Sequence, residues 1–385
     1  MKIQGQELNA FDVPSFVTKL LGNTQHSKRI ESIANAALGI ISSASLIMHR
    51  LGRGMAAALN LSDKHAVKQV DRLLSNKKFD IEESQENITL FLVGGRTEVK
   101  IAMDWTDFDG DKQTTLSFNL ITAHGRATPL LWKTFPKEGL KDNRNGYEDE
   151  LLQRLRELIP ESVKVTIVAD RGFCDTKLME FLKQLNFHYI IRIRSNILVW
   201  EEGKEACVAS EYVQEKGRIK TIRDAKITHE KYAVATFVCI KAEKMKQAWC
   251  IVSSDPQLSG SGIVKWYTKR WGCEPQFRDT KDIYHGMGLS KTHIRDPKKR
   301  DRLLFIHEIS TIILTFLGAA CEKIGLDKYF KVNTSKKRSL SLFNQGIILF
   351  NRLPKMCEET LRKLLTCFSE LLDEHRTLTH ILAIV

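Results

Sequence analysis

The chain has 385 residues, which is long enough for two or three folded parts. Of these residues 43% are hydrophobic and 27% charged, a composition that excludes a disordered chain. Its formal net charge of +13 makes long polyanions attractive partners, because each neutralised phosphate releases condensed counterions. The eight cysteines include no C-x-x-C pair, which argues against a zinc module or a disulfide framework and favours a reducing cytoplasm.

Residues 1 to about 90 have a helical pattern. The polar residues at the start of the chain give no sign of an export signal. Apolar residues between Ser62 and Ser75 follow helical spacing, and Ser62 is a suitable N-cap. A short helix at 53–58 before it would complete a helix-turn-helix, which favours DNA binding. A bundle helix with a solvated basic face explains the same pattern. The cations on the exposed face are Lys64, Lys68 and Arg72.

Short β patterns follow at 98–103, 114–122 and 127–133, then a helix near 147–158 and a strand at 163–169. Three strands, a helix and a fourth strand indicate an α/β sheet. Asp104 and Asp170 each come directly after a predicted strand, where ligands of open α/β sheets usually gather. Taken alone, a carboxylate in a strand-end turn is an equally good explanation.

Residues 187–255 are again rich in β patterns and are interpreted as an insertion. From about residue 263 the chain returns to helix. Its longest apolar stretch, 303–321, contains His307 and Glu308, so we predict a buried helix and no membrane span. The histidines His285, His293 and His307 occur in unrelated contexts and are not expected to form a metal site.

Four side chains near residue 270 form the most specific pattern. Tyr267, Arg270, Glu274 and Lys281 fall within about 60° of arc on an ideal helix. A glutamate can bind a hard cation while neighbouring cations hold a DNA backbone. On spacing alone, a solvated charged helix face explains the pattern as well. A kink is predicted here, because Gly272 and Pro275 weaken a helix, and it could rotate Lys281 off the shared face.

These four residues match the Y-x-x-R-x-x-x-E-x-x-x-x-x-x-K signature of bacterial insertion-sequence DDE transposases that move by cut-and-paste. The chain resembles the branch found in insertion sequences flanking a tetracycline-resistance transposon. Asp104, in Met-Asp-Trp-Thr, resembles the first catalytic aspartate of that family, and Asp170, in Asp-Arg-Gly-Phe, resembles the second. The likeness covers most of the chain.

The resemblance implies an RNase H-like catalytic domain with a β-rich insertion before the glutamate helix. We accordingly expect a helical domain at 1–95 that binds DNA ends, a catalytic domain at 96–300 with its insertion at about 187–255, and a helical C-terminal region at 301–385, a candidate for dimerisation. Asp104, Asp170 and Glu274 would hold two Mg²⁺ or Mn²⁺ ions per active site.

The implied reaction is excision through a DNA hairpin followed by joining to target DNA. Its partners would be the terminal inverted repeats, the target, and a second copy of the chain in a synaptic homodimer. The expected location is the bacterial cytoplasm, on the nucleoid and without a membrane. A hairpin forces a base out of the stack, and Trp249 or Trp271 could receive it; each is otherwise an ordinary packing residue.

The remaining predicted DNA contacts lie in the signature and in the basic run 291–300, for which a solvated loop is the alternative. They are Tyr267, Arg270, Lys281, Lys298 and Arg300. Two other functions stay open from the sequence. One is a different RNase H-like nuclease, acting on junctions or RNA–DNA hybrids; the other is a non-catalytic DNA-binding inhibitor of transposition, which intact carboxylates argue against.

Overall fold

The middle of the chain forms one eight-stranded mixed sheet, in the order β3-β2-β1-β4-β5-β12-β11-β8. The computed structural model describes residues 5–22, 24–243, 245–284, 286–331 and 338–373. The strands of this sheet are β1 (Glu98–Phe108), β2 (Gln113–Leu120), β3 (Thr128–Pro136), β4 (Lys164–Ala169), β5 (His188–Ile193), β8 (Lys220–Arg223), β11 (Thr236–Ile240) and β12 (Trp249–Ser253). The predicted α/β class is confirmed.

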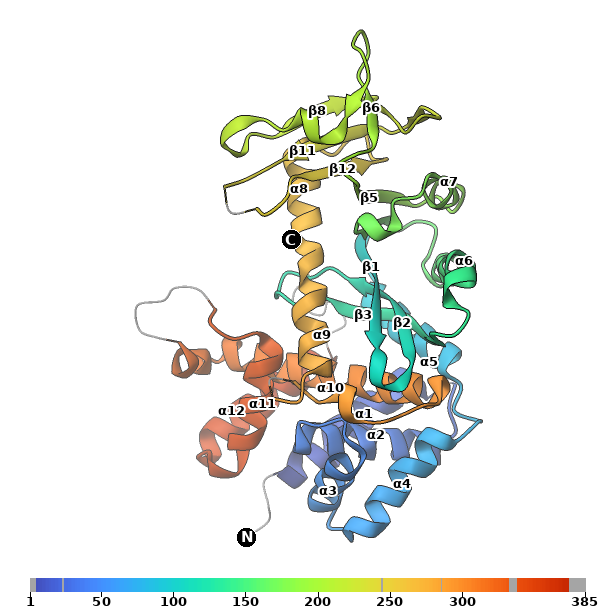
Figure 1. Cartoon of the computed structure of the whole chain (residues 1–385). Helices are drawn as coiled ribbons and strands as arrows, with labels where there is room; N and C mark the ends of the chain where they lie inside the picture. The colour runs from blue at the N-terminus through green and yellow to red at the C-terminus, as the bar shows by residue number, and fades with distance from the viewer. Residues whose placement is uncertain (1–4, 23, 244, 285, 332–337, 374–385) are drawn as a thin grey trace.

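Only two neighbouring pairs in this sheet are parallel, β1 with β4 and β4 with β5. Both faces of these strands are covered, so they are nearly continuous runs of apolar residues, as parallel strands usually are. One face packs on α8 (Gly260–Lys269), through Val168 and Ile263. The opposite face packs on α6 (Leu140–Leu158) and α7 (Thr176–Gln184), as Figure 1 shows.

The segment predicted as an insertion divides between two sheets. Its first strand, β5, is the fifth strand of the central sheet. Strand β5 buries Tyr189, Ile190 and Ile191 beside β4, a pairing that local alternation cannot reveal. Strands β8, β11 and β12 widen the same sheet. A separate four-stranded sheet contains β6 (Leu198–Trp200), β7 (Cys207–Val208), β9 (Lys226–Ile227) and β10 (Tyr232–Ala233).

In the described part of the chain, five helices precede the sheet, and they pack closely where glycines remove side-chain bulk. They are α1 (Gly5–Leu21), α2 (Ser27–Ser43), α3 (Met48–Leu59), α4 (Asp63–Ser75) and α5 (Ile81–Val93). A Cβ on Gly52 would lie 2.3 Å from Val67, so α3 and α4 cross at close range. The predicted cap is confirmed, because the Ser62 hydroxyl accepts from the backbone N–H of His65 at 3.4 Å. The short helix predicted at 53–58 is part of α3, which is longer and spans Met48–Leu59.

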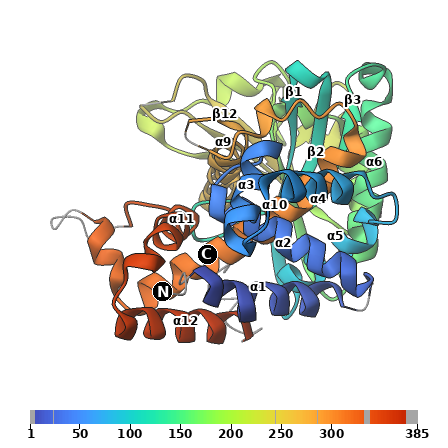
Figure 2. The ribbon, with the colours of Figure 1, turned by 90° about the horizontal axis from the view of Figure 1, so that it is seen from below.

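The C-terminal region is organised around α10 (Pro297–Lys323), which packs against the N-terminal helices, β3, α11 (Leu342–Arg352) and α12 (Glu358–Asp373). Figure 2 shows α10 running beneath the sheet among these helices. Within the described residues, α10 is long and apolar enough to cross a membrane, as is the pair α2–α3 if its 101° bend is ignored. However, 89% of the apolar window of α10 is buried in the protein, so the predicted buried helix is confirmed.

Candidate active site

Asp104 and Asp170 are brought together by the end of the parallel pairing between β1 and β4. The last residues in register are Met103 and Ala169, and each aspartate follows one of them. Asp170 begins a short 3₁₀ turn, in which its Oδ1 accepts from the backbone N–H of Gly172 at 2.7 Å. The predicted position of Asp170 at a strand end is therefore confirmed.

For Asp104 the predicted strand end is wrong, because β1 continues to Phe108. Beyond Met103 the strand loses β4 as a partner but keeps β2, where Asp104 lies opposite Ser117. Asp104 is thus held by a strand that extends past it on both sides. This places the carboxylate on a rigid element at the carboxyl end of β4, where an open α/β sheet usually binds its ligands.

Arg270 is the direct partner of Asp104. Its Nη1 donates to Oδ2 of Asp104 at 3.0 Å, and the two side chains are 8% and 20% exposed. Burial raises the pKa of Asp104 to about 6; the positive charge of Arg270 opposes the rise and the negative charge of Asp170 adds to it. The arginine therefore offsets part of the cost of keeping two carboxylates together in a partly buried site.

The signature residues lie on three successive helical segments: Tyr267 on α8, Arg270 on a 3₁₀ turn (Arg270–Gly272), and Glu274 on α9 (Cys273–Lys281). The backbone angles of Lys269, Arg270, Gly272 and Cys273 are all helical, and Figure 1 shows α8 and α9 as one continuous rod. The predicted kink is therefore wrong. Pro275 is tolerated because it lies in the first turn of α9, where a backbone N–H is not needed.

The other three signature side chains, Tyr267, Glu274 and Lys281, differ in their exposure and in their contacts. Tyr267 is 1% exposed and packs edge-to-face on Trp249, with ring centroids 5.0 Å apart. Lys281 donates from Nζ to the backbone oxygen of Asp107 at 2.7 Å, which ties the end of α9 to β1. Glu274 is exposed. Tyr267 was predicted to touch DNA, and its burial contradicts a direct contact.

The donor set fits a divalent metal in part. Asp104 and Asp170 offer neighbouring carboxylates, which are the oxygen ligands that Mg²⁺ and Mn²⁺ prefer. Burial is the main cause that raises the pKa of the Cys273 thiol, and the negative charges of Asp104 and Glu274 raise it further. Glu274 is the next residue after Cys273 on α9. Within the described ranges, no three His, Cys, Asp or Glu side chains are grouped closely enough to hold a metal ion.

Sequence reasoning missed a basic pocket beside Asp170. Of the described residues that line it, none is acidic, and four are cations: Arg171, Arg192, Arg194 and Lys241. Arg171 follows Asp170 directly and donates to Oε1 of Gln247 at 3.3 Å. The available signal was the alternation of Arg192, on β5, with Arg194, directly after β5, since alternate residues of an extended chain share one face. Strand β5 lies next to β4, which ends one residue before Asp170.

The two tryptophans differ in access. Trp271 is 51% exposed, whereas Trp249 is half-buried against Tyr267. Of the histidines, His285 lies outside the described residues, His293 is exposed, and His307 is buried with Nδ1 2.9 Å from the Thr311 hydroxyl.

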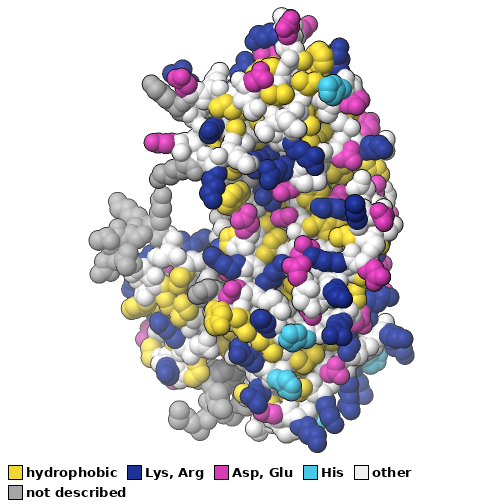
Figure 3. Space-filling model, viewed as in Figure 1, with side chains coloured by type: hydrophobic (Ala, Val, Ile, Leu, Met, Phe, Trp, Pro, Cys, Tyr) yellow, Lys and Arg dark blue, Asp and Glu magenta, His cyan; other side chains and the backbone are white. Residues whose placement is uncertain are grey.

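Basic side chains of α4 lie on the surface, and Figure 3 shows Lys and Arg gathered at the lower right, over this helix. The exposed predicted contacts are Lys64, Lys68, Arg72 and Lys298. Lys299 bonds Asp71 at 3.2 Å, so the start of α10 lies beside α4. Arg300 was predicted to contact DNA, but it is 0% exposed and donates to Asp111 and Gln113 inside the protein. It therefore cannot contact a phosphate in this structure.

Neighbouring carboxylates at the end of a parallel strand pair can hold divalent metal ions, which nucleases and polymerases use to cut or join phosphodiesters. Residues 97–312, more than half of the chain, match the family described as the transposase DDE domain, and the chain belongs to that family. Membership implies an RNase H-like fold, a transposase role, DNA as partner and a use of divalent metal ions. A comparison with curated proteins finds no match.

Proposed function

We propose that this chain is a cut-and-paste transposase that excises an insertion sequence through a DNA hairpin and joins it to target DNA. The observation that carries the proposal is the placement of Asp104 beside Asp170 at the end of the β1–β4 pairing, with Arg270 bonded to Asp104. Both aspartates lie within the region that matches the transposase DDE domain. This arrangement supports phosphodiester chemistry at that edge of the sheet.

Asp104, Asp170 and Glu274 would hold Mg²⁺ or Mn²⁺, two ions per site, which when bound supply a deprotonated water and neutralise the leaving oxygen. Arg270 holds the Asp104 carboxylate in one orientation and reduces its repulsion with Asp170. Lys281 fixes the far end of α9 to β1 through Asp107. These contacts orient the acidic groups before DNA arrives, which lowers the reorganisation needed during reaction.

Two surfaces are proposed to hold the DNA. The exposed face of α4, with Lys298 beside it, would bind the terminal inverted repeats, since its cations are spaced one helical turn apart. The basic pocket around Arg171 and Arg194 would hold the strand that leads to Asp170, because nothing acidic among its described lining opposes a phosphate.

The proposed organisation keeps the domain boundaries predicted from the sequence, although β5, β8, β11 and β12 of the predicted insertion all belong to the central sheet. Residues 1–95 would bind ends, 96–300 would cut, and the helical region 301–385 would support a homodimer in the synaptic complex. Residues 332–337 and 374–385 of that region lie outside the described part of the chain. The setting would be the bacterial nucleoid.

Removal of any of the three acidic ligands should abolish cleavage while leaving DNA-end binding intact. The variants are Asp104→Asn, Asp170→Asn and Glu274→Gln, and the matched control is Asp142→Asn, an exposed aspartate on α6. Cleavage is measured on supercoiled DNA that carries both ends, with Mg²⁺, with Mn²⁺ and with chelator. Cutting that persists in a variant would remove that residue from the metal site. End-independent cutting of junctions or hybrids would favour another RNase H-like nuclease.

Loss of the α4 cations should weaken end binding and flatten its dependence on salt. Lys68→Ala and Arg72→Ala each remove one expected phosphate contact, so the slope of log affinity against log salt should fall by roughly one per residue. Lys363→Ala, an exposed lysine on α12, is the control. The measurement is a filter-binding titration at several salt concentrations. Unchanged slopes would show that α4 is an ordinary solvated helix face.

Trp271 is the stronger candidate for receiving the extruded base, because it is 51% exposed. Trp271→Ala should spare the first nick and slow hairpin formation or opening by roughly tenfold to a hundredfold, since base stacking contributes ~1–3 kcal/mol. End-labelled DNA on a denaturing gel separates the nicked, hairpin and broken products.

Two further variants help to interpret that gel. Trp249→Ala should also lower thermal stability, because Trp249 packs on Tyr267. Tyr329→Ala removes another exposed aromatic side chain, outside the signature, and should change no step. An equal loss of nicking and hairpin formation in Trp271→Ala would refute the base-receiving role.

A further inference from the structure

The segment that carries Glu274 is held at two points by adjacent residues of the loop between β2 and β3. Nε of Arg126 donates to Oδ2 of Asp279 at 2.6 Å. The backbone N–H of Ala127 donates to the carbonyl oxygen of Gly272 at 3.1 Å. The first contact lies five residues after Glu274 and the second lies two residues before it, so together they enclose the position of this glutamate on α9.

Both contacts are largely protected from water. The Arg126 and Asp279 side chains are 19% and 9% exposed, so the ion pair is screened far less than a surface pair. A Cβ on Gly272 would lie 3.3 Å from the backbone nitrogen of Ala127, which shows how closely loop and helix approach. The Thr122 hydroxyl donates to the Arg126 carbonyl and braces the loop itself.

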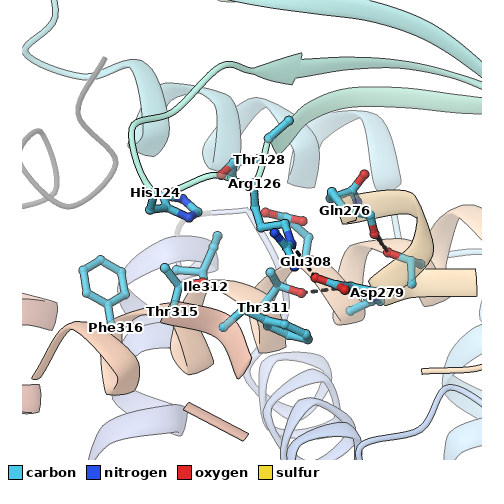
Figure 4. Close-up of a pocket in the computed structure, with 14 residues that line it drawn as sticks. His124, Arg126, Thr128, Gln276, Asp279, Glu308, Thr311, Ile312, Thr315 and Phe316 are labelled. Carbon is cyan, nitrogen blue, oxygen red and sulfur yellow. Dashed lines mark hydrogen bonds and ion pairs between the residues drawn. The ribbon is translucent and has the colours of Figure 1, made fainter. Parts of the chain in front are cut away.

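On the side of α9 that faces α10, the described residues make no such contact. Figure 4 shows a pocket between α9 and α10 into which Gln276 and Glu308 point, beside the Arg126–Asp279 pair. Three buried polar atoms around it, Oε1 of Gln276, Oε1 of Glu308 and Nε2 of His307, have no hydrogen-bond partner within the described residues. Among the described residues, no hydrogen bond from α10 fixes α9 at this level. The loop contacts therefore act together with the bonds from Arg270 to Asp104 and from Lys281 to Asp107 in holding this helical rod.

We propose that Arg126 is a positioning residue that sets the approach of Glu274 to Asp104 and Asp170 through its ion pair with Asp279. The inference rests on the proposed role of Glu274 as a metal ligand. Arg126 touches neither DNA nor metal in this account. Its effect passes along one and a half turns of α9, a short rigid element, so a shift at Asp279 is transmitted to Glu274.

The test is a double-variant cycle read by metal binding and not by activity. Binding of Mn²⁺ to the full chain is followed by the electron paramagnetic resonance signal of the free ion, in Arg126→Gln, in Glu274→Gln and in the double variant. Arg126→Gln should weaken Mn²⁺ binding by about tenfold, the loss typical when a group that orients a ligand is removed. In the Glu274→Gln background it should cause no further loss.

Two variants separate positioning from folding. Lys164→Gln breaks another ion pair to a buried aspartate, Lys164–Asp255 at 2.7 Å, at the opposite end of β4. It should cost similar thermal stability and leave Mn²⁺ binding unchanged. Arg126→Lys keeps a cation that can reach Asp279 and should restore most of the binding.

The outcomes distinguish this inference from the function it rests on. If Glu274→Gln weakens Mn²⁺ binding but Arg126→Gln does not, the positioning role is refuted and the metal role of Glu274 stands. A loss by Arg126→Gln that persists in the Glu274→Gln background would likewise refute it, because the effect would not pass through Glu274. If Glu274→Gln itself leaves Mn²⁺ binding unchanged, the proposed metal site fails and the positioning role fails with it.

Discussion

The parallel pairing of β1 with β4 is the constraint on which the candidate site depends. The paired register ends at Met103 and Ala169, and the next residue on each strand is an aspartate, Asp104 or Asp170. The strand pairing therefore brings the two carboxylates close together. Their proximity is unfavourable by itself, since like charges at a partly buried site repel. Arg270, reaching across from the helical rod on one face of the sheet, reduces that repulsion by bonding Asp104.

Two buried arginines on α10, Arg300 and Arg302, connect this helix to the central sheet and to the N-terminal helical region. Arg300 bonds Asp111 and Gln113 at the turn after β1, while Arg302 donates to the backbone oxygens of Leu74 and Phe79 at the end of α4 and beyond it. Removing one partner of a buried charged contact is strongly destabilising, so these links resist separation. One helix therefore joins the proposed end-binding region to the catalytic sheet, which favours a fixed geometry between end recognition and cutting.

The parts of the site that could be predicted from the sequence are those with local signals. An apolar strand followed by Asp170, a serine cap before α4 and a long apolar run in α10 each depend on neighbouring residues. The parts that could not be predicted depend on distant partners. Arg300 looked like one more cation of a basic loop, yet its partner Asp111 lies 189 residues away. The strand order that includes β5 is likewise a product of pairing across the fold.

The central proposal is that Glu274 would join Asp104 and Asp170 in one site for two divalent metal ions. Replacing the ion with Fe²⁺ and adding ascorbate and peroxide generates hydroxyl radicals at the bound metal, which cut the polypeptide nearby, and the fragments can be sized by mass spectrometry. Cuts near residues 104, 170 and 274, competed away by Mg²⁺ and absent from Asp104→Asn, are the result expected from this account. Cuts near 104 and 170 with none near 274, or cuts elsewhere in the chain, would contradict it.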